Sequence, residues 1–330
     1  MKKIMILFCV CYILLASATM ASVVNPHQTY TYERMKADIW ELEKKYDDDL
    51  TVKTIGYSHF GRRIFAVKLG KGEKNILLIG SHHGREWLTS ALLMEMLETY
   101  TKSYQANGKV GPHSTDILDE VSIWFVPMLN PDGVTIQQGD IKKFPKYHRD
   151  NLVLMNMNST DFSRWKANGM GIDLNRQYPV GWKNHANNDV TIPTYQFYKG
   201  KKPISTHETK AIVKFTKKIK PQIAVSYHTS GREIFWNYNN KENQQRDLSI
   251  AEKVAALTGY KLASPPQDAI GAGYTDWFIS TFQRPALTLE ISHLVGETNP
   301  PLEVFSEEWE KNKFIGMMLA KEAKNINNPK

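Results

Sequence analysis

Short, predominantly apolar segments alternate with amphipathic helical segments along most of this chain. The segment 75–80 contains Ile-Leu-Leu-Ile without interruption, and comparable runs occupy 121–128, 222–227 and 286–291. A strand that is apolar on both faces is typical of a largely parallel sheet covered by helices. The helical segments between the runs supply the covering layers. The pattern therefore predicts an α/β fold with a mixed, mainly parallel sheet and helices on both faces.

The remaining pattern predicts one domain with a long irregular region. Helices are expected at 32–46, 87–104, 206–219, 249–257 and 305–325, and a hairpin is expected at 50–69. The region 137–202 has few apolar runs and many Asn, Gly, Tyr and Trp residues, which predicts long loops. Loops of that length in a compact domain are usually functional. No repeat, low-complexity tract or linker divides the chain, so residues 22–330 are predicted to form a single domain.

The first 21 residues have the layout of a secretory signal peptide. Lys2 and Lys3 precede an apolar run at 4–16, and small residues follow as far as Ala21. The run is shorter than the roughly 20 residues that span a bilayer. We therefore expect cleavage after Ala18 or Ala21, secretion of the remaining chain, and no membrane span in it.

Cysteine content and charge limit what the exported chain can do. Both cysteines, Cys9 and Cys11, lie in the signal segment, so the mature chain would have no disulfide and no thiol nucleophile or metal ligand. The net charge is +8, and removal of Lys2 and Lys3 reduces it by two. A mildly basic exported protein suits an anionic bacterial wall, although solubility explains the charge equally well. The basic residues are dispersed without a nucleic-acid-binding motif, so no nucleic acid partner is expected.

Three potential zinc ligands follow the ends of predicted strands. His83 and Glu86 come after the first apolar run, and His228 directly follows the third, 142 positions beyond Glu86 (228 − 86). The carboxyl ends of parallel strands meet at the ligand crevice of such a sheet, so these side chains can converge. Two histidines and a carboxylate, with a fourth position left for water, indicate a catalytic zinc site. An isolated His-x-x-Glu is a weak signal. His82 has a different spacing to Glu86 and is interpreted as a supporting residue.

The segments around these residues resemble the zinc carboxypeptidase family, metallopeptidase M14, in the family's order. The resemblance covers about residues 30 to 320. The matching motifs are Ser81-His82-His83-Gly84-Arg85-Glu86-Trp87, Asn130-Pro131-Asp132-Gly133, Gly171-Ile172-Asp173-Leu174-Asn175-Arg176, Tyr227-His228, Gly273-Tyr274-Thr275-Asp276-Trp277 and Leu287-Thr288-Leu289-Glu290. The resemblance implies one zinc ion and hydrolysis of a peptide or isopeptide amide near a free carboxylate.

The resemblance also implies catalytic roles. Glu290 corresponds to the general base beside the attacking water, and a lone glutamate in an apolar strand would otherwise be costly to bury. Arg85 and Lys166 correspond to the positive charges that face the developing oxyanion. The family more often has arginine at the position of Lys166, so Arg164 is a nearby alternative.

Substrate-binding roles are implied for four further residues. Asn175 and Arg176 resemble the pair that binds a substrate carboxylate. The animal digestive members carry a mobile tyrosine where this chain has Asp268, and Tyr274 either covers part of that role or simply packs. Thr275 occupies the pocket floor and is neither acidic nor aliphatic. A small polar floor favours a polar, zwitterionic group such as that of diaminopimelate.

Two segments resemble one bacterial branch of the family, the γ-D-glutamyl-(L)-meso-diaminopimelate peptidases. They are Trp165-Lys166-Ala167-Asn168 and the tail that begins Gly296-Glu297-Thr298-Asn299-Pro300. The favoured hypothesis is a secreted, monomeric enzyme, associated with the cell wall, that cleaves the γ-D-glutamyl-diaminopimelate bond of peptidoglycan stem peptides. The alternative is a general secreted metallocarboxypeptidase that releases C-terminal amino acids. A wall-binding module without catalysis is disfavoured because no ligand and no general base is missing.

Overall fold

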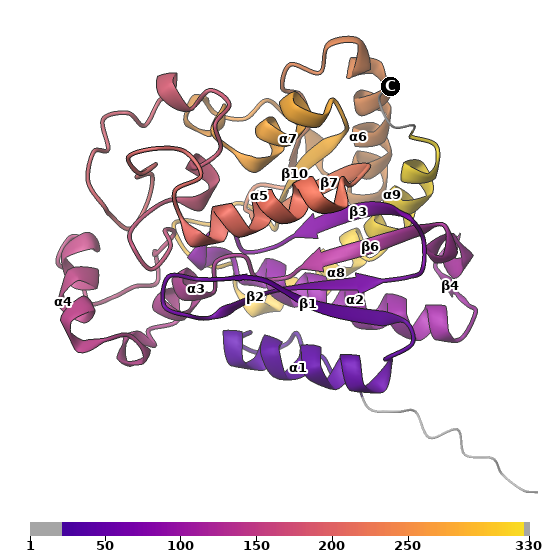
Figure 1. Ribbon diagram of the computed structural model, residues 1–330, viewed down its shortest axis with the longest axis horizontal. Coiled ribbons are helices and arrows are strands. Elements are labelled where there is room, and N and C mark those ends of the chain that lie inside the picture. The colour runs from indigo at the N-terminus through magenta and orange to yellow at the C-terminus, as the bar shows by residue number, and fades with distance from the viewer. Residues whose placement is uncertain (1–21, 327–330) are drawn as a thin grey trace, which may run out of the picture.

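The computed structural model describes residues 22–326 and has one domain around an eight-stranded sheet (Figure 1). The predicted signal segment, 1–21, lies outside the described residues. The strands follow the order β1-β2-β6-β3-β7-β10-β8-β9. Their bounds are β1 (Leu50–Tyr57), β2 (Arg63–Leu69), β6 (Val121–Val126), β3 (Lys74–Ile79), β7 (Ile223–Thr229), β10 (Ala286–Ile291), β8 (Glu233–Phe235) and β9 (Lys261–Leu262). A separate small sheet pairs β4 (Lys109–Val110) with β5 (His113–Ser114).

The centre of the large sheet is parallel. β3 pairs in parallel with β6 and β7, and β7 pairs in parallel with β10. β1, β2 and β6 pair antiparallel, as do β10 and β8. Every residue of β6 is buried, and in β7 only the last residue is not, as strands covered on both faces require. The prediction of a mixed, mainly parallel sheet is therefore confirmed.

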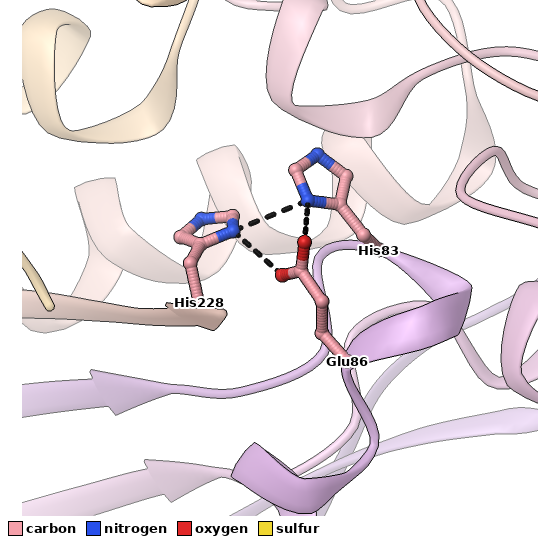
Figure 2. Close-up of side chains that lie close together, drawn as sticks. All are labelled: His83, Glu86 and His228. Atoms are coloured by element: carbon pink, nitrogen blue, oxygen red, sulfur yellow. Dashed lines mark hydrogen bonds and ion pairs between the residues drawn. The ribbon is translucent and has the colours of Figure 1, made fainter. Parts of the chain in front are cut away.

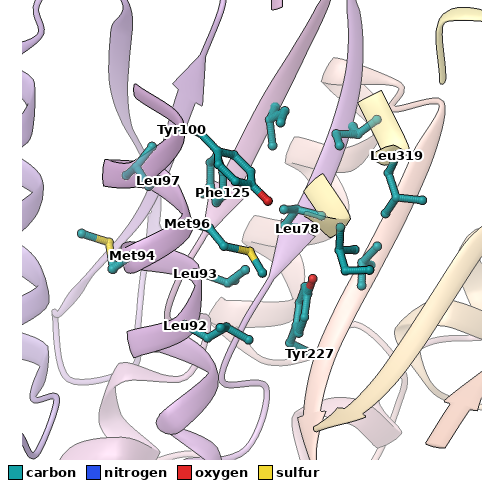
Figure 3. Packing of buried hydrophobic residues seen from close by; sticks show 14 of the residues in the cluster. Leu78, Leu92, Leu93, Met94, Met96, Leu97, Tyr100, Phe125, Tyr227 and Leu319 are labelled. Atoms are coloured by element: carbon teal, nitrogen blue, oxygen red, sulfur yellow. The ribbon is translucent and has the colours of Figure 1, made fainter. Parts of the chain in front are cut away.

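Helices cover both faces of the sheet. Their bounds are α1 (Tyr32–Lys45), α2 (Leu88–Gln105), α3 (Pro131–Gln137), α4 (Lys146–Met155), α5 (His207–Ile219), α6 (Gln244–Thr258), α7 (Tyr274–Phe282), α8 (Phe305–Asn312) and α9 (Ile315–Lys324). Side chains alternate along each central strand, so that Leu78 faces a core shared with α2 and α9 while Leu77 faces a core shared with α5 and α7. Figure 3 shows the first of these cores, with Leu78 and Tyr227 between α2 and Leu319 of α9.

Two predicted elements differ from the structure. The region 137–202 contains α4 in addition to long loops. The helix expected at 305–325 is divided into α8 and α9. At the break, the hydroxyl of Tyr100 donates to the carbonyl of Lys313 (2.9 Å) and accepts from the N–H of Gly316 (3.2 Å). A side chain from α2 thus replaces helical hydrogen bonds there.

No helix within residues 22–326 is both long enough and apolar enough to cross a bilayer.

Candidate active site

The proposed zinc ligands converge at the carboxyl ends of β3 and β7. Ile79 ends β3, and the chain then enters a single 3-10 turn, η1 (Gly84–Glu86), which carries Glu86 directly beside His83. His228 is the penultimate residue of β7. The turn lies close against neighbouring backbone, since the N–H of Gly84 donates to the carbonyl of Lys166 (2.9 Å). The turn that carries Glu86 is therefore held in place by a backbone contact with the loop around Lys166.

The ligand atoms of the three side chains lie around one point (Figure 2). The Nδ1 atom of His83 is 2.7 Å from one oxygen of Glu86, and the Nδ1 atom of His228 is 2.8 Å from the other. The two Nδ1 atoms are 3.2 Å apart. A cation between the two nitrogens would bind both lone pairs, whereas without one a nitrogen must donate a proton to the other nitrogen or to Glu86. The donor set fits a divalent cation such as zinc.

The three ligands are buried, with exposed fractions of 2–3%. Burial alone would raise the pKa of Glu86, but the two neighbouring histidines hold it well below its usual range. An ionised carboxylate is the form that binds a metal. Within the described residues, no other group of three His, Cys, Asp or Glu side chains comes together in this way.

Asp173 orients His83, and the sequence interpretation assigned it no role. One oxygen of its buried carboxylate is 3.1 Å from Nε2 of His83, on the side of the ring opposite the ligand nitrogen. Burial would raise the pKa of Asp173, but His83 and Lys166 lower it well below the usual range. A carboxylate on the second nitrogen of a ligand histidine fixes the tautomer and ring orientation. The position of Asp173 in the Gly-x-Asp-x-Asn-Arg motif was the sequence signal from which this role could have been predicted.

His82 lies outside the ligand group. Its ring nitrogens face the hydroxyl of Tyr178 (3.2 Å) and the hydroxyl of Ser226 (3.4 Å), and its ring stacks on His228 at 5.3 Å between centroids. Burial, and then the neighbouring histidines, hold the pKa of His82 well below its usual value. The geometry is that of a neutral ring packed behind His228, as a supporting residue would be.

Glu290 stands beside the ligands on the next strand. In β10 it pairs in register with His228 of β7, so the two side chains project from the same face of the sheet. Burial, and then the charge of Glu86, raise the pKa of Glu290. A carboxylate that holds its proton more strongly than usual is a better proton acceptor from water at neutral pH.

Lys166, rather than Arg164, reaches the site. The Nζ atom of Lys166 is 3.9 Å from Asp173, and the side chain is buried. Burial lowers the pKa of Lys166, and Asp173 partly offsets this. Arg164 instead stacks on the ring of Tyr195 at 4.0 Å and donates to the carbonyl of Asn156. The geometry therefore favours Lys166 over Arg164 as the second cation of the site.

Arg85 sits at the rim of the same region. Its Nη1 atom donates to the carbonyl of Arg164 (3.1 Å) and to the side chain of Gln196 (3.2 Å). Glu297, from the tail segment after β10, lies 3.8 Å from the same atom. Arg85 is thus held by the loops around the site and is about one-eighth exposed, at 13%.

Asn175 and Arg176 come from one 3-10 turn, η4 (Leu174–Arg176). The amide of Asn175 reaches the outer nitrogen of His228 (3.4 Å), and its oxygen accepts from the N–H of Tyr274 (2.9 Å). Arg176 donates to the side chain of Asn187 (3.3 Å). The turn thereby places an amide and a guanidinium beside the ligand group.

Tyr274 and Thr275 begin α7 but face different surroundings. Tyr274 is 1% exposed, and its hydroxyl pairs with Thr216 (3.0 Å) inside the core. These contacts agree with the second of the two roles considered for Tyr274, in which the side chain simply packs. Thr275 instead pairs with Thr288 of β10, hydroxyl to hydroxyl, at 2.7 Å. Because Thr288 lies two positions before Glu290 on the same strand, this polar pair shares the face of the general base.

Comparison with known proteins agrees with this geometry. Residues 35–313 match the family described as "Zinc carboxypeptidase". The chain is 31% identical over 303 residues to gamma-D-glutamyl-L-diamino acid endopeptidase 1 of Lysinibacillus sphaericus, an alignment that covers 90% of this chain and 73% of the relative.

Two solved structures share the fold. Bovine thrombin-activatable fibrinolysis inhibitor, solved with tick carboxypeptidase inhibitor, superposes with a TM-score of 0.71 at 18% identity, covering 91% of this chain and 99% of that one. Carboxypeptidase A from Helicoverpa armigera gives a TM-score of 0.67 at 19% identity over 91% and 75% of the two chains. The family match spans most of the sequence and includes all three ligands. The chain therefore belongs to the zinc carboxypeptidase family, and it is a metallopeptidase whose cofactor is a single zinc ion.

Proposed function

We propose that this enzyme cleaves the γ-D-glutamyl bond to a diamino acid, diaminopimelate, in peptidoglycan stem peptides. The main support is the 31% identity, over 90% of the chain, to an endopeptidase named for γ-D-glutamyl-L-diamino acids. The Trp165–Asn168 segment and the Gly296–Pro300 tail agree with it. The hydroxyl pair of Thr275 and Thr288 gives the site a polar floor that suits a charged side chain.

The metal would be held by Nδ1 of His83, the carboxylate of Glu86 and Nδ1 of His228. When bound, zinc polarises the scissile carbonyl and lowers the pKa of its bound water strongly, to about 7. Glu290 takes the proton of the attacking water and delivers it to the leaving amine nitrogen. Arg85 and Lys166 place positive charge where the carbonyl oxygen becomes negative.

The substrate is oriented through its free carboxylate. Asn175 and Arg176 offer an amide N–H and a guanidinium, which together match the two oxygens of a carboxylate. The same pair suits the C-terminal carboxylate of any peptide. A general metallocarboxypeptidase that releases C-terminal amino acids is therefore the second candidate.

A pair of peptides that differ only in linkage tests the proposal. The zinc-loaded enzyme is offered γ-D-glutamyl-diaminopimelate and α-L-glutamyl-diaminopimelate stem peptides, and products are quantified by mass spectrometry. Faster hydrolysis of the γ-D-glutamyl peptide is expected. Faster hydrolysis of the α-L-glutamyl peptide would overturn the assignment in favour of a general carboxypeptidase. The Glu290→Gln variant is the control, and it should keep zinc while losing about 100- to 10,000-fold in turnover.

The place of action is proposed to be outside the cell, at or near the wall. The support is the apolar run at 4–16 flanked by Lys2, Lys3 and small residues. Expression of the full chain in a bacterial host should release protein whose N-terminus is Thr19 or Ser22. An intact Met1 on protein that stays in the cell contradicts secretion.

A further inference from the structure

A third ionisable side chain stands in line with His228 and Glu290. In β10, Glu290 pairs with His228 of β7 on one side and with Glu233 of β8 on the other. Neighbouring strands lie about 4.8 Å apart, and paired residues project from the same face. Glu233 therefore flanks the general base on the side opposite the zinc ligand, within the site rather than apart from it.

The carboxylate of Glu233 has no partner within residues 22–326. None of the hydrogen bonds and ion pairs of the described residues involves this carboxylate, although the residue is partly buried. Its neighbour Arg232 turns away and binds Glu307 (2.7 Å) and Glu308 (2.8 Å). Like charges opposite one another on adjacent strands are destabilising, and no cation within residues 22–326 pairs with the carboxylate of Glu233.

Glu233 also lies next to the polar floor of the site. Two positions away along the same strands, Thr288 pairs with Phe235, and the hydroxyl of Thr288 contacts Thr275. Two residues of a strand span about 7 Å, which is the reach of a four- or five-carbon side chain. A substrate side chain that runs from the scissile bond beside Glu290 toward the threonines passes the free carboxylate.

We propose that Glu233 is a specificity-determining residue that binds the second ammonium group of a diamino acid on the leaving side of the scissile bond. This assignment rests on the proposed function, because it presumes a diamino acid at that position. Arg176 supplies the positive charge for a carboxylate, and Glu233 supplies the negative charge for an ammonium group. A charge-assisted hydrogen bond forms with the diamino acid, whereas a neutral side chain leaves the partly buried carboxylate of Glu233 unpaired.

Two substrates that differ only in the second amino group isolate this contact. They are γ-D-glutamyl-diaminopimelate and γ-D-glutamyl-2-aminopimelate, which share the carbon chain and both carboxylates. The parent enzyme should prefer the first in kcat/KM by about 10- to 100-fold, the range for one hydrogen bond between charged groups. In Glu233→Gln the ratio should collapse toward one, mainly through KM. Glu233→Asp keeps the charge and should keep part of the preference.

The ratio separates recognition from structural damage. Any effect that loss of the Glu233 charge has on Glu290 acts on both substrates equally and cancels in the ratio. Glu303→Gln, at an exposed position, is the matched control and should keep the full ratio. An unchanged ratio in a folded, zinc-loaded Glu233→Gln enzyme overturns the assignment. Failure of the proposed function is a different result, namely faster cleavage of α-L-glutamyl than of γ-D-glutamyl peptides.

Discussion

We expect Glu208 to make the stability of this protein fall as the pH rises. The residue lies in the first turn of α5 and is fully buried. One of its oxygens accepts from the amide of Asn168 (3.2 Å), and the other has no hydrogen-bond partner within the described residues. Burial, and then the charge of Asp132, raise the pKa of Glu208 from 4.5 to about 7. The folded protein thus holds a proton that the unfolded chain releases.

The direction and the size of the change in stability follow from the shift in the pKa of Glu208. Below pH 4.5 the carboxyl is protonated in both states and has no effect. Between pH 4.5 and 7 only the unfolded state ionises, so stability is lost steadily as the pH rises. Above pH 7 the folded state ionises too, and the loss levels off at about 3 kcal/mol, from 1.36 kcal/mol per pKa unit. Glutamine has the shape of the protonated acid, so Glu208→Gln should remove this loss while keeping the contact with Asn168.

Urea unfolding followed by tryptophan fluorescence at pH 4.5 to 8.5 measures the difference. Glu208→Gln and the parent should be nearly equal at pH 4.5, and the variant should be about 3 kcal/mol more stable at pH 8. At a fixed zinc concentration, titration of the zinc ligands affects both proteins equally, so it cancels in the difference between their free energies of unfolding. Glu303→Gln, on the surface, controls for the loss of one negative charge. A difference between Glu208→Gln and the parent that stays constant with pH would refute the reasoning.

Three further substitutions test the site and its support. His228→Ala should lose both zinc, measured by atomic absorption, and hydrolysis, whereas parent enzyme treated with a chelator should recover on adding zinc. Gly84→Ala places a Cβ 2.5 Å from the carbonyl oxygen of Gly133, so η1 must shift. We expect the free energy of unfolding in urea to fall by about 1–3 kcal/mol, and zinc binding in a competition titration to weaken. Asp132→Ala removes the buried partner of Arg62 (2.6 Å), and should lower the free energy of unfolding by about 3–5 kcal/mol; a loss below 1 kcal/mol contradicts this account.

The sequence predicted the parts of the fold that depend on local pattern. β3, β6, β7 and β10 are apolar at most of their positions because both of their faces are covered. β8 and β9 have three and two residues, which is too short for a periodic signal. The division between α8 and α9 depends on the hydroxyl of Tyr100, which comes from another helix. Local pattern therefore predicts buried strands well, and it cannot predict contacts between distant elements.

The same limit applies to the site. The ligand set was proposed from strand ends and motif resemblance, and the structure brings these three side chains together. The sequence could not decide whether Lys166 or Arg164 reaches the site, because the two residues are only two positions apart. The folded loop shows that Lys166 faces Asp173. Glu233 gave no signal, since its position beside Glu290 follows from β8 lying next to β10.

The order of the strands explains why ligands so far apart in sequence meet. From β3 the chain continues to β6 on one side of β3, and β7 later joins on the other side. Where connections leave in opposite directions, the carboxyl ends of the two strands are the usual place for a ligand site in such a sheet. His83 and Glu86 follow β3, and His228 is the penultimate residue of β7, so all three lie at this end of the sheet. β10 adds Glu290 and β8 adds Glu233 in the same row. The metal position is thus set by topology, and we infer that the strands beyond β7 tune which substrate is cut.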